Sequence, residues 1–221
     1  MRKPIAQLEY ITRDAEKHIL VKEVELACSG GVRWVQLRLK NRSEADIISI
    51  AKEVKAICKK YNSVFIINDY VNVSIEVDAD GVHLGKSDMS FLGARKLLGD
   101  GKIIGGSTNS FEDILNLNDL DLDYVGLGPF RFTTTKENLN PLLGEEGIQH
   151  VMKQVKNNNI QIPIIAIGGI QLGDVASLIN YGVHGVAVSS AISDSENIEI
   201  EARKFVNACS IKSAVVEQMA N

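Results

Sequence analysis

The 221-residue sequence predicts an α/β fold of the (β/α)8, or TIM-barrel, class. Short apolar runs alternate with amphipathic segments from one end of the chain to the other. The apolar runs lack regular polar alternation, which is typical of parallel strands buried on both faces. Eight runs occur, each followed by a helical or turn-and-helix segment, and right-handed crossovers would close such units into a barrel. Seven or nine units are the alternatives, because a sequence sets element boundaries only loosely.

The expected strands are rich in valine, isoleucine, leucine and aromatic residues. They comprise residues 7–12, 34–38, 64–68, 81–84, 103–106, 124–128, 164–167 and 186–188. In a closed parallel barrel the carboxyl ends of all strands meet at one face, and that face carries the active site. Polar residues that follow the strands are therefore the candidates for function.

The clearest expected helix covers residues 43–61, where Ser43 can act as the N-cap and apolar residues recur at helical spacing. The other expected helices cover residues 15–29, 91–98, 111–117, 144–157, 171–181 and 198–208. The sixth unit is the longest, and its additional residues fall between Pro129 and Leu143. A long loop after a barrel strand is usually a lid or a ligand clamp.

Composition predicts one soluble domain spanning residues 1–221, with 45% apolar and 24% charged residues. The net charge of -4 and the isoelectric point near 5.6 argue against a nucleic-acid partner. No apolar stretch is long enough to span a bilayer and no N-terminal signal is visible, so we expect no membrane partner and a cytoplasmic location. Cys28, Cys58 and Cys209 lack metal-ligand spacing and indicate buried thiols of a cytosolic protein.

The most informative segment follows the sixth expected strand. The strand bends at Gly126, Gly128 and Pro129, and the chain then presents three threonines and a lysine in Thr133–Lys136. A strand that ends in glycines and opens into such residues is typical of a site for a phosphate-bearing ligand. A polar surface loop is the alternative, and similar residues at other strand ends favour the site.

The early strand ends carry cations and carboxylates. Gln36, Arg38 and Lys40 alternate and so share one side of an extended segment, which suits a pyrophosphate; a solvated loop edge is the alternative. Asp69 and Asp88 follow consecutive strands and can meet. Two carboxylates repel a phosphate, but they suit a Mg²⁺ ion that also binds phosphate oxygens.

The late strand ends predict a second anion site. Gly168-Gly169-Ile170 and Ser189-Ser190 offer backbone amides and hydroxyls after the seventh and eighth strands, where barrels commonly bind a phosphate monoester. The four histidines are scattered, so no zinc site is expected. His83 lies inside a strand, and packing is the favoured role over catalysis.

Six segments together carry a resemblance to a known family. They are residues 31–40, 67–69, 80–88, 104–107, 125–136 and 166–170. In order and spacing the chain resembles the thiamine phosphate synthase (thiamine-phosphate pyrophosphorylase) family from Tyr10 to Ile192. The resemblance implies a Mg²⁺-dependent transferase that joins a hydroxymethylpyrimidine diphosphate to a thiazole phosphate, or its carboxylated form, and releases pyrophosphate. The two partners would be small phosphorylated substrates, and a homo-oligomer is left open.

The resemblance also implies roles for individual residues. For the pyrimidine diphosphate they are Gln36, Arg38, Lys40, Asn68, Ser107 and Lys136, with Arg38, Ser107 and Lys136 as catalytic groups. For Mg²⁺ they are Asp69 and Asp88. For the thiazole phosphate they are Thr133, Thr135, Gly169, Ser189 and Ser190.

The sequence departs from the family pattern at a few positions. Lys86 stands where Gln or Glu is common, Asn109 where His is frequent, Thr134 where Pro is frequent, and Ser189 where an apolar residue is common. We expect these differences to affect substrate affinity and loop dynamics more than the reaction.

The implied mechanism is dissociative, with cleavage of the carbon–oxygen bond before the thiazole nitrogen attacks. The alternatives are a thiazole tautomerase on the same barrel, a non-catalytic sensor of a phosphate ester, and another phosphate-binding barrel enzyme.

Overall fold

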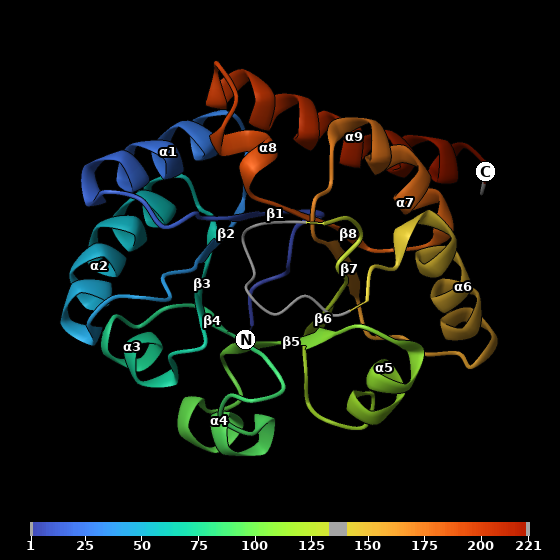
Figure 1. Ribbon diagram of the computed structural model, residues 1–221, viewed down its shortest axis with the longest axis horizontal. Helices are drawn as coiled ribbons and strands as arrows, with labels where there is room; N and C mark the ends of the chain where they lie inside the picture. The colour runs from blue at the N-terminus through green and yellow to red at the C-terminus, as the bar shows by residue number, and fades with distance from the viewer. Residues whose placement is uncertain (1, 133–140, 220–221) are drawn as a thin grey trace.

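Eight parallel strands form a closed barrel in the order β1 to β8, with β8 paired back to β1, as Figure 1 shows. The computed structural model describes residues 2–132 and 141–219. The strands are β1 (Leu8–Ile11), β2 (Trp34–Leu37), β3 (Val64–Asn68), β4 (Gly81–Leu84), β5 (Ile103–Thr108), β6 (Tyr124–Leu127), β7 (Ile164–Ile167) and β8 (Gly185–Val188). The predicted (β/α)8 class is confirmed, and the alternatives of seven or nine units are wrong.

Helices surround the barrel in Figure 1. They are α1 (Lys17–Ser29), α2 (Glu44–Lys60), α3 (Val71–Glu76), α4 (Phe91–Leu98), α5 (Phe111–Leu117), α6 (Gly144–Asn157), α7 (Val175–Tyr181), α8 (Ser190–Ser193) and α9 (Ile198–Met219), with a 3-10 turn, η1 (Leu172–Asp174), before α7. The helix α9 packs against both α1 and α7, which closes the ring. Ser43 caps α2 as predicted, because its Oγ accepts a hydrogen bond from the backbone N–H of Asp46.

Several boundaries differ from the prediction. The expected helix 171–181 begins as the 3-10 turn η1, and α9 continues past the predicted end at residue 208. The prediction omitted α3, which has only six residues and cannot repeat an amphipathic pattern. The strand β5 extends two residues beyond the expected 103–106, so Ser107 belongs to the strand and has a fixed direction.

The core has two layers. The larger layer fills the space between the strands and the helices, and the smaller one lies inside the barrel. The interior is anchored by Trp34 and Tyr124, whose rings meet edge to face at a centroid distance of 4.7 Å. A Cβ on Gly105 would lie 2.1 Å from the Tyr124 ring, so a glycine at this point of β5 is what admits the tyrosine. Glu9 also belongs to the interior and is only 2% exposed.

The three cysteines are buried and free, as the sequence predicts. Within the ranges that the structure describes, no helix is both long enough and apolar enough to cross a bilayer.

Candidate active site

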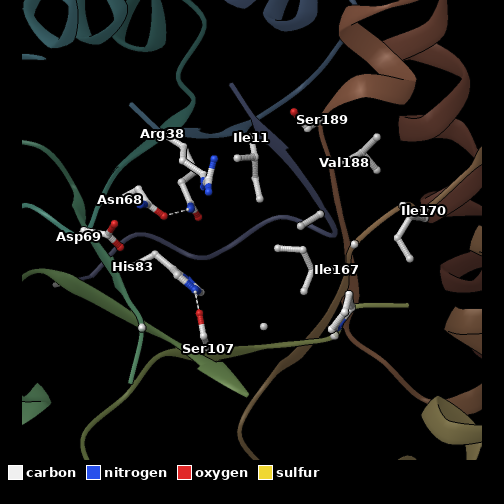
Figure 2. Close-up of a pocket in the computed structure, with 18 of the residues that line it drawn as sticks. Ile11, Arg38, Asn68, Asp69, His83, Ser107, Ile167, Ile170, Val188 and Ser189 are labelled. Carbon is white, nitrogen blue, oxygen red and sulfur yellow. Dashed lines mark hydrogen bonds between the residues drawn. The ribbon is translucent and has the colours of Figure 1, made fainter. Parts of the chain in front are cut away.

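A cavity of about 330 Å³ opens at the carboxyl ends of the strands. Its wall contains ten of the predicted residues: Gln36, Arg38, Lys40, Asn68, Asp69, Asp88, Ser107, Gly169, Ser189 and Ser190. The predicted residues Thr133, Thr135 and Lys136 lie outside the described residues, as does Thr134. In Figure 2, Arg38, Asn68, Asp69, His83 and Ser107 lie on one side of the cavity, and Ile167, Ile170, Val188 and Ser189 lie on the other. The cavity therefore has a polar side from the early strands and a second side from the late strands.

Two amides form a pair on the polar side. Gln36 donates from Nε2 to Oδ1 of Asn68 at 2.8 Å, across the boundary between β2 and β3. Both side chains are buried, and in the described part of the chain Gln36 Oε1 and Asn68 Nδ2 have no hydrogen-bond partner. A buried amide group without a partner is expensive unless a ligand or water satisfies it. The pair thus offers one acceptor and one donor to a bound molecule.

The two predicted carboxylates come together. Asp69 and Asp88 are close enough for their side chains to interact, and Lys40 Nζ lies 3.0 Å from Asp69 Oδ2. Burial and the neighbouring carboxylate Asp88 together raise the pKa of Asp69, against the opposing effect of Lys40. Asp69 follows β3 at a φ of 65°, in the left-handed region that Asp tolerates better than most residues. This turn is what directs its carboxylate toward the loop of Asp88.

Asp88 is held by its own loop, since its Oδ2 accepts a hydrogen bond of 2.7 Å from the backbone N–H of Gly85. Lys86, between them, binds both carboxylate oxygens of Asp113 at 2.7 Å. The Lys86 ammonium, one of the departures from the family pattern, is therefore paired with Asp113. Burial raises the pKa of Asp113, but Lys86 and the backbone N–H groups of Asn109 and Ser110 outweigh it, and the net pKa is lowered.

The Ser107 hydroxyl contacts His83, for which the sequence favours packing over catalysis. His83 is buried, as expected, and its Nε2 lies 2.9 Å from Ser107 Oγ (Figure 2). The imidazole also lines the cavity, and its Nδ1 lies 3.0 Å from the hydroxyl of Tyr124. The sequence could have indicated that His83 faces the barrel interior, because side chains alternate along a strand and His83 shares the inward side of β4 with Gly81.

The late-strand side is built from backbone and hydroxyl groups. Gly168 and Gly169 follow β7 with φ values of 98° and 67°, which only glycine adopts readily. Ser189 precedes the short helix α8, and its Oγ is buried with no partner among the described residues. An unpartnered hydroxyl beside the start of a helix suits an anionic ligand.

The long loop after β6 is anchored at both described ends. Asn109 donates from Nδ2 to the carbonyl of Gly128 at 2.8 Å and to that of Pro141 at 3.2 Å. The backbone N–H of Leu143 returns to the carbonyl of Pro129 at 3.0 Å. Arg131 binds the carboxylate of Asp174 with two nitrogens and so ties the start of the loop to η1. Hydrogen bonds thus tie the described residues on either side of residues 133–140 to the loops after β5 and β6 and to η1.

Comparison with known proteins identifies the family. The family model described as "Thiamine monophosphate synthase" matches residues 8–192. The thiamine-phosphate synthase of Flavobacterium johnsoniae is 45% identical over 194 residues, 88% of this chain and 92% of the relative. That of Bacteroides thetaiotaomicron is 39% identical over 203 residues, 92% of this chain and 97% of the relative.

A solved structure agrees with these relatives. The thiamine phosphate pyrophosphorylase from Pyrococcus furiosus superposes with a TM-score of 0.80 at 29% identity, covering 93% of this chain and 96% of that one. The match spans every strand of the barrel and every described wall residue of the cavity. The chain therefore belongs to the thiamine monophosphate synthase family and is an enzyme of thiamine biosynthesis.

Proposed function

We propose that the enzyme joins 4-amino-2-methyl-5-hydroxymethylpyrimidine diphosphate to 4-methyl-5-(2-hydroxyethyl)thiazole phosphate, or to its carboxylated form, and releases pyrophosphate. The observation that carries the proposal is the meeting of Asp69 and Asp88 beside the cations that follow β2, on one side of a cavity whose other side offers hydroxyl and amide groups. Two substrates that each carry phosphate need two such places. A substrate with a single phosphate would use only one of them.

The diphosphate would bind on the early-strand side. Arg38 and Lys40 supply positive charge, and Ser107 supplies a hydroxyl. The backbone N–H of Arg38 binds Thr12 Oγ1 at 3.0 Å, which supports the segment that carries both cations. Lys136 would complete this diphosphate site, and its assignment rests on the family resemblance.

The pyrimidine ring would lie against the amide pair. The free acceptor of Gln36 and the free donor of Asn68 match a ring that carries an amino group beside a ring nitrogen. Both amides are buried, so a ring that lacks either partner would leave a polar group unsatisfied, and this favours the aminopyrimidine over similar rings.

Mg²⁺ is the cofactor in this proposal, and the donor set fits it. Two adjacent carboxylates with room for phosphate oxygens are the arrangement that Mg²⁺ commonly uses, and Asp69 and Asp88 would hold it. When bound, Mg²⁺ supplies charge neutralisation for the leaving diphosphate. Among the described residues no group of three or more acidic, histidine or cysteine side chains could form a metal site by itself, so phosphate oxygens would complete the coordination.

The thiazole phosphate would bind on the late-strand side. Ser189 and Ser190 provide hydroxyls there, and Gly169 brings backbone close to the cavity. Thr133 and Thr135 would also bind the thiazole phosphate, and their assignment rests on the family resemblance. Ile11 and, on the late-strand side, Ile167 and Val188 give the cavity wall apolar surface, beside which the rings of both substrates would meet away from water.

The reaction assigns little acid–base work to the protein. The carbon–oxygen bond to the diphosphate breaks with its electron pair leaving on the diphosphate, and the aminopyrimidine stabilises the resulting methylene cation. The lone pair of the thiazole nitrogen then forms the new carbon–nitrogen bond. Arg38, Lys40 and Lys136 would stabilise the charge that develops on the leaving group, which is the kind of contribution that preorganised charges make best.

The carboxylates also separate this activity from the thiazole tautomerase on the same barrel. A tautomerase needs no site for a diphosphate, and this chain retains the cations, the amide pair and both carboxylates on the early-strand side of the cavity.

The proposal places the enzyme in the cytoplasm, where the buried free thiols would stay reduced.

The test is direct. The purified protein is incubated with both substrates, with and without Mg²⁺, and thiamine phosphate and pyrophosphate are measured. We expect both products in equal amounts only when Mg²⁺ is present. Isomerisation of the thiazole carboxylate phosphate alone, without pyrophosphate, would show a tautomerase instead.

A further inference from the structure

Glu9 is a buried carboxyl group for which the proposed reaction has no use. It lies on the inward side of β1 and is 2% exposed. The strands around the barrel interior carry few titratable residues: Glu9 and Tyr10 from β1, His83 from β4, and Tyr124 from β6. Tyr10 alternates to the outer layer of the core, so His83 and Tyr124 are the titratable strand residues that share the interior with Glu9.

These interior groups form a chain that ends at the cavity. Glu9 Oε1 lies 3.5 Å from Tyr124 Oη, at the outer limit of hydrogen bonding. Tyr124 Oη lies 3.0 Å from His83 Nδ1, and His83 Nε2 lies 2.9 Å from Ser107 Oγ. Ser107 lines the cavity, whereas Glu9 and Tyr124 do not. Four groups from four strands thus connect a buried carboxyl to the diphosphate side of the site.

The direction of donation along this chain depends on one proton. A neutral imidazole donates from one ring nitrogen and accepts at the other, and a hydroxyl has a single proton. If Glu9 is protonated, it donates to Tyr124, Tyr124 donates to His83 Nδ1, and His83 Nε2–H donates to Ser107. The Ser107 proton is then free to point into the cavity. If Glu9 is ionised, each bond reverses and Ser107 donates its proton to His83.

We propose that Glu9 is a positioning residue which, through Tyr124 and His83, directs the Ser107 hydroxyl proton toward the diphosphate. A diphosphate oxygen accepts hydrogen bonds and never donates when ionised, so only one of the two directions serves it. This inference rests on the proposed function, because it takes the diphosphate as the ligand beside Ser107.

The environment of Glu9 supports the protonated form. Burial raises the pKa of Glu9 to about 8, with Tyr124 acting in the opposite sense. The strands that flank β1 contribute no charge, since β2 is Trp-Val-Gln-Leu and β8 is Gly-Val-Ala-Val. Burial, together with the nearby Glu9 and Asp123, raises the pKa of Tyr124 well above its ordinary value, so the phenol stays neutral. Near pH 7 the chain should donate toward Ser107, and above about pH 8 it should reverse.

The first measurement is the tautomer of His83. Nitrogen-15 spectra of histidine-labelled protein distinguish the two neutral tautomers, and His83→Gln identifies the signal. In the wild-type protein we expect the proton on Nε2 at pH 7 and a shift toward Nδ1 above pH 8. In Glu9→Gln, whose amide N–H donates at every pH, the Nε2 tautomer should persist to pH 9.5. A tautomer that ignores both pH and Glu9→Gln would overturn the proposal.

The second measurement is binding of pyrophosphate with Mg²⁺ by calorimetry from pH 6.5 to 9.5. Pyrophosphate itself titrates in this range, so the wild-type dissociation constant is divided by that of Glu9→Gln at each pH. We expect this ratio to rise about tenfold across the range, the size of one hydrogen bond to a charged group. Ser107→Ala should bind pyrophosphate more weakly than the wild type does. Its dissociation constant divided by that of Glu9→Gln should stay constant across the pH range.

Controls separate positioning from folding and from function. Glu196→Gln changes an exposed carboxyl and should follow the wild type at each pH. Tyr124→Phe interrupts the chain without removing bulk, and it should lose the pH-dependent ratio while thermal melts show a folded protein. If the pyrophosphate dissociation constants of the wild type, Glu9→Gln and Tyr124→Phe change in parallel with pH, the positioning role of Glu9 is disproved, while the proposed transferase activity stands. If the wild type neither binds pyrophosphate nor makes thiamine phosphate, the proposed function is wrong, and so is the positioning role of Glu9 that rests on it.

Discussion

Gln36 donates a hydrogen bond of 2.8 Å to Asn68, and in the described part of the chain this bond leaves one acceptor of Gln36 and one donor of Asn68 without a partner, in two side chains that line the cavity. The bond does more than join β2 to β3. It fixes which amide group of each side chain is available to a ligand, because the bonded ends are already occupied. The recognition of a pyrimidine ring would therefore depend on both residues together.

The first prediction concerns this pair. Asn68→Ala should lower kcat/KM for the pyrimidine diphosphate by 1–3 kcal/mol, roughly the cost of leaving a buried amide unsatisfied. Gln36→Ala should lower it by a similar amount, and the double variant by less than the sum, because the two side chains share one hydrogen bond. Steady-state kinetics with each substrate varied in turn check this, and KM for the thiazole phosphate should stay near the wild-type value. Strict additivity of the two variants would contradict the shared bond.

The sequence predicts the fold well because the barrel repeats one simple pattern. Apolar runs of four to six residues mark the strands, and the bounds of β3, β4 and β7 agree with the prediction to the residue. The six-residue α3 was omitted because it is too short to show helical spacing. The end of β5 was placed before Ser107 because glycines there weaken the strand pattern.

The site was predictable only in part. Residues at strand ends were found because every parallel strand ends at the same face, so position along the chain implies position in space. Glu9, Tyr124 and His83 were not assigned to the site, because their contacts cross the interior between β1, β4 and β6. A sequence does not state which side chains meet inside a barrel. The glycine that admits Tyr124 belongs to yet another strand, β5.

The second prediction concerns the backbone of the late-strand side. Gly169 has a φ of 67°, and a Cβ there would lie 2.8 Å from Cβ of Arg131. Gly169→Ala should lower the free energy of unfolding by about 1–3 kcal/mol and raise KM for the thiazole phosphate. Gly173→Ala is a matched control, because a Cβ at this position of η1 has no neighbour within 4 Å. Urea unfolding and steady-state kinetics of the two variants test this prediction. Equal free energies of unfolding for Gly169→Ala and Gly173→Ala would contradict it.

The third prediction concerns the ion pair between Arg131 and Asp174. A double-mutant cycle with Arg131→Ala and Asp174→Ala should give a coupling of about 0.5–1 kcal/mol at low salt, because the arginine side chain is 48% exposed and screened by water. The coupling should shrink in 1 M salt. Arg131→Lys should recover little of it, since two nitrogens of the guanidinium bind the carboxylate at once. Full rescue by lysine would show that charge alone matters.

The fourth prediction concerns the carboxylates. Asp88→Asn should raise the Mg²⁺ concentration needed for half-maximal activity at least tenfold, because one of the two proposed ligands loses its charge. Asp69→Asn should act in the same direction. Asp100→Asn removes an exposed carboxylate from the loop after α4 and serves as the control. A Mg²⁺ titration of each variant makes the test, and an unchanged titration for Asp88→Asn would exclude this residue as a ligand.

The last prediction follows from the buried carboxyl of Glu9. Its pKa is about 8 in the folded protein against 4.5 in the reference state, so the folded protein keeps a proton that the unfolded chain releases. Any stability that this group contributes is fully present below about pH 4.5 and is lost as the pH rises toward 8. Glu9→Gln cannot ionise and should escape this loss. The free energy of unfolding of Glu9→Gln, minus that of the wild type, should therefore increase between pH 5 and pH 8 by several kcal/mol, at most roughly 5.

Denaturant unfolding of both proteins at half-unit pH steps measures this difference, and all other titrating groups cancel in it because they are common to both. The sign is the sharp part of the test. A carboxylate whose pKa is lowered in the folded protein would be ionised in both states from pH 5 to pH 8, so the difference would stay constant there and would change in the opposite sense only below about pH 5. A difference that is constant from pH 5 to pH 8 would therefore mean that the pKa of Glu9 is ordinary or lowered despite its burial, which would require that the carboxylate find a donor stronger than the single hydroxyl of Tyr124.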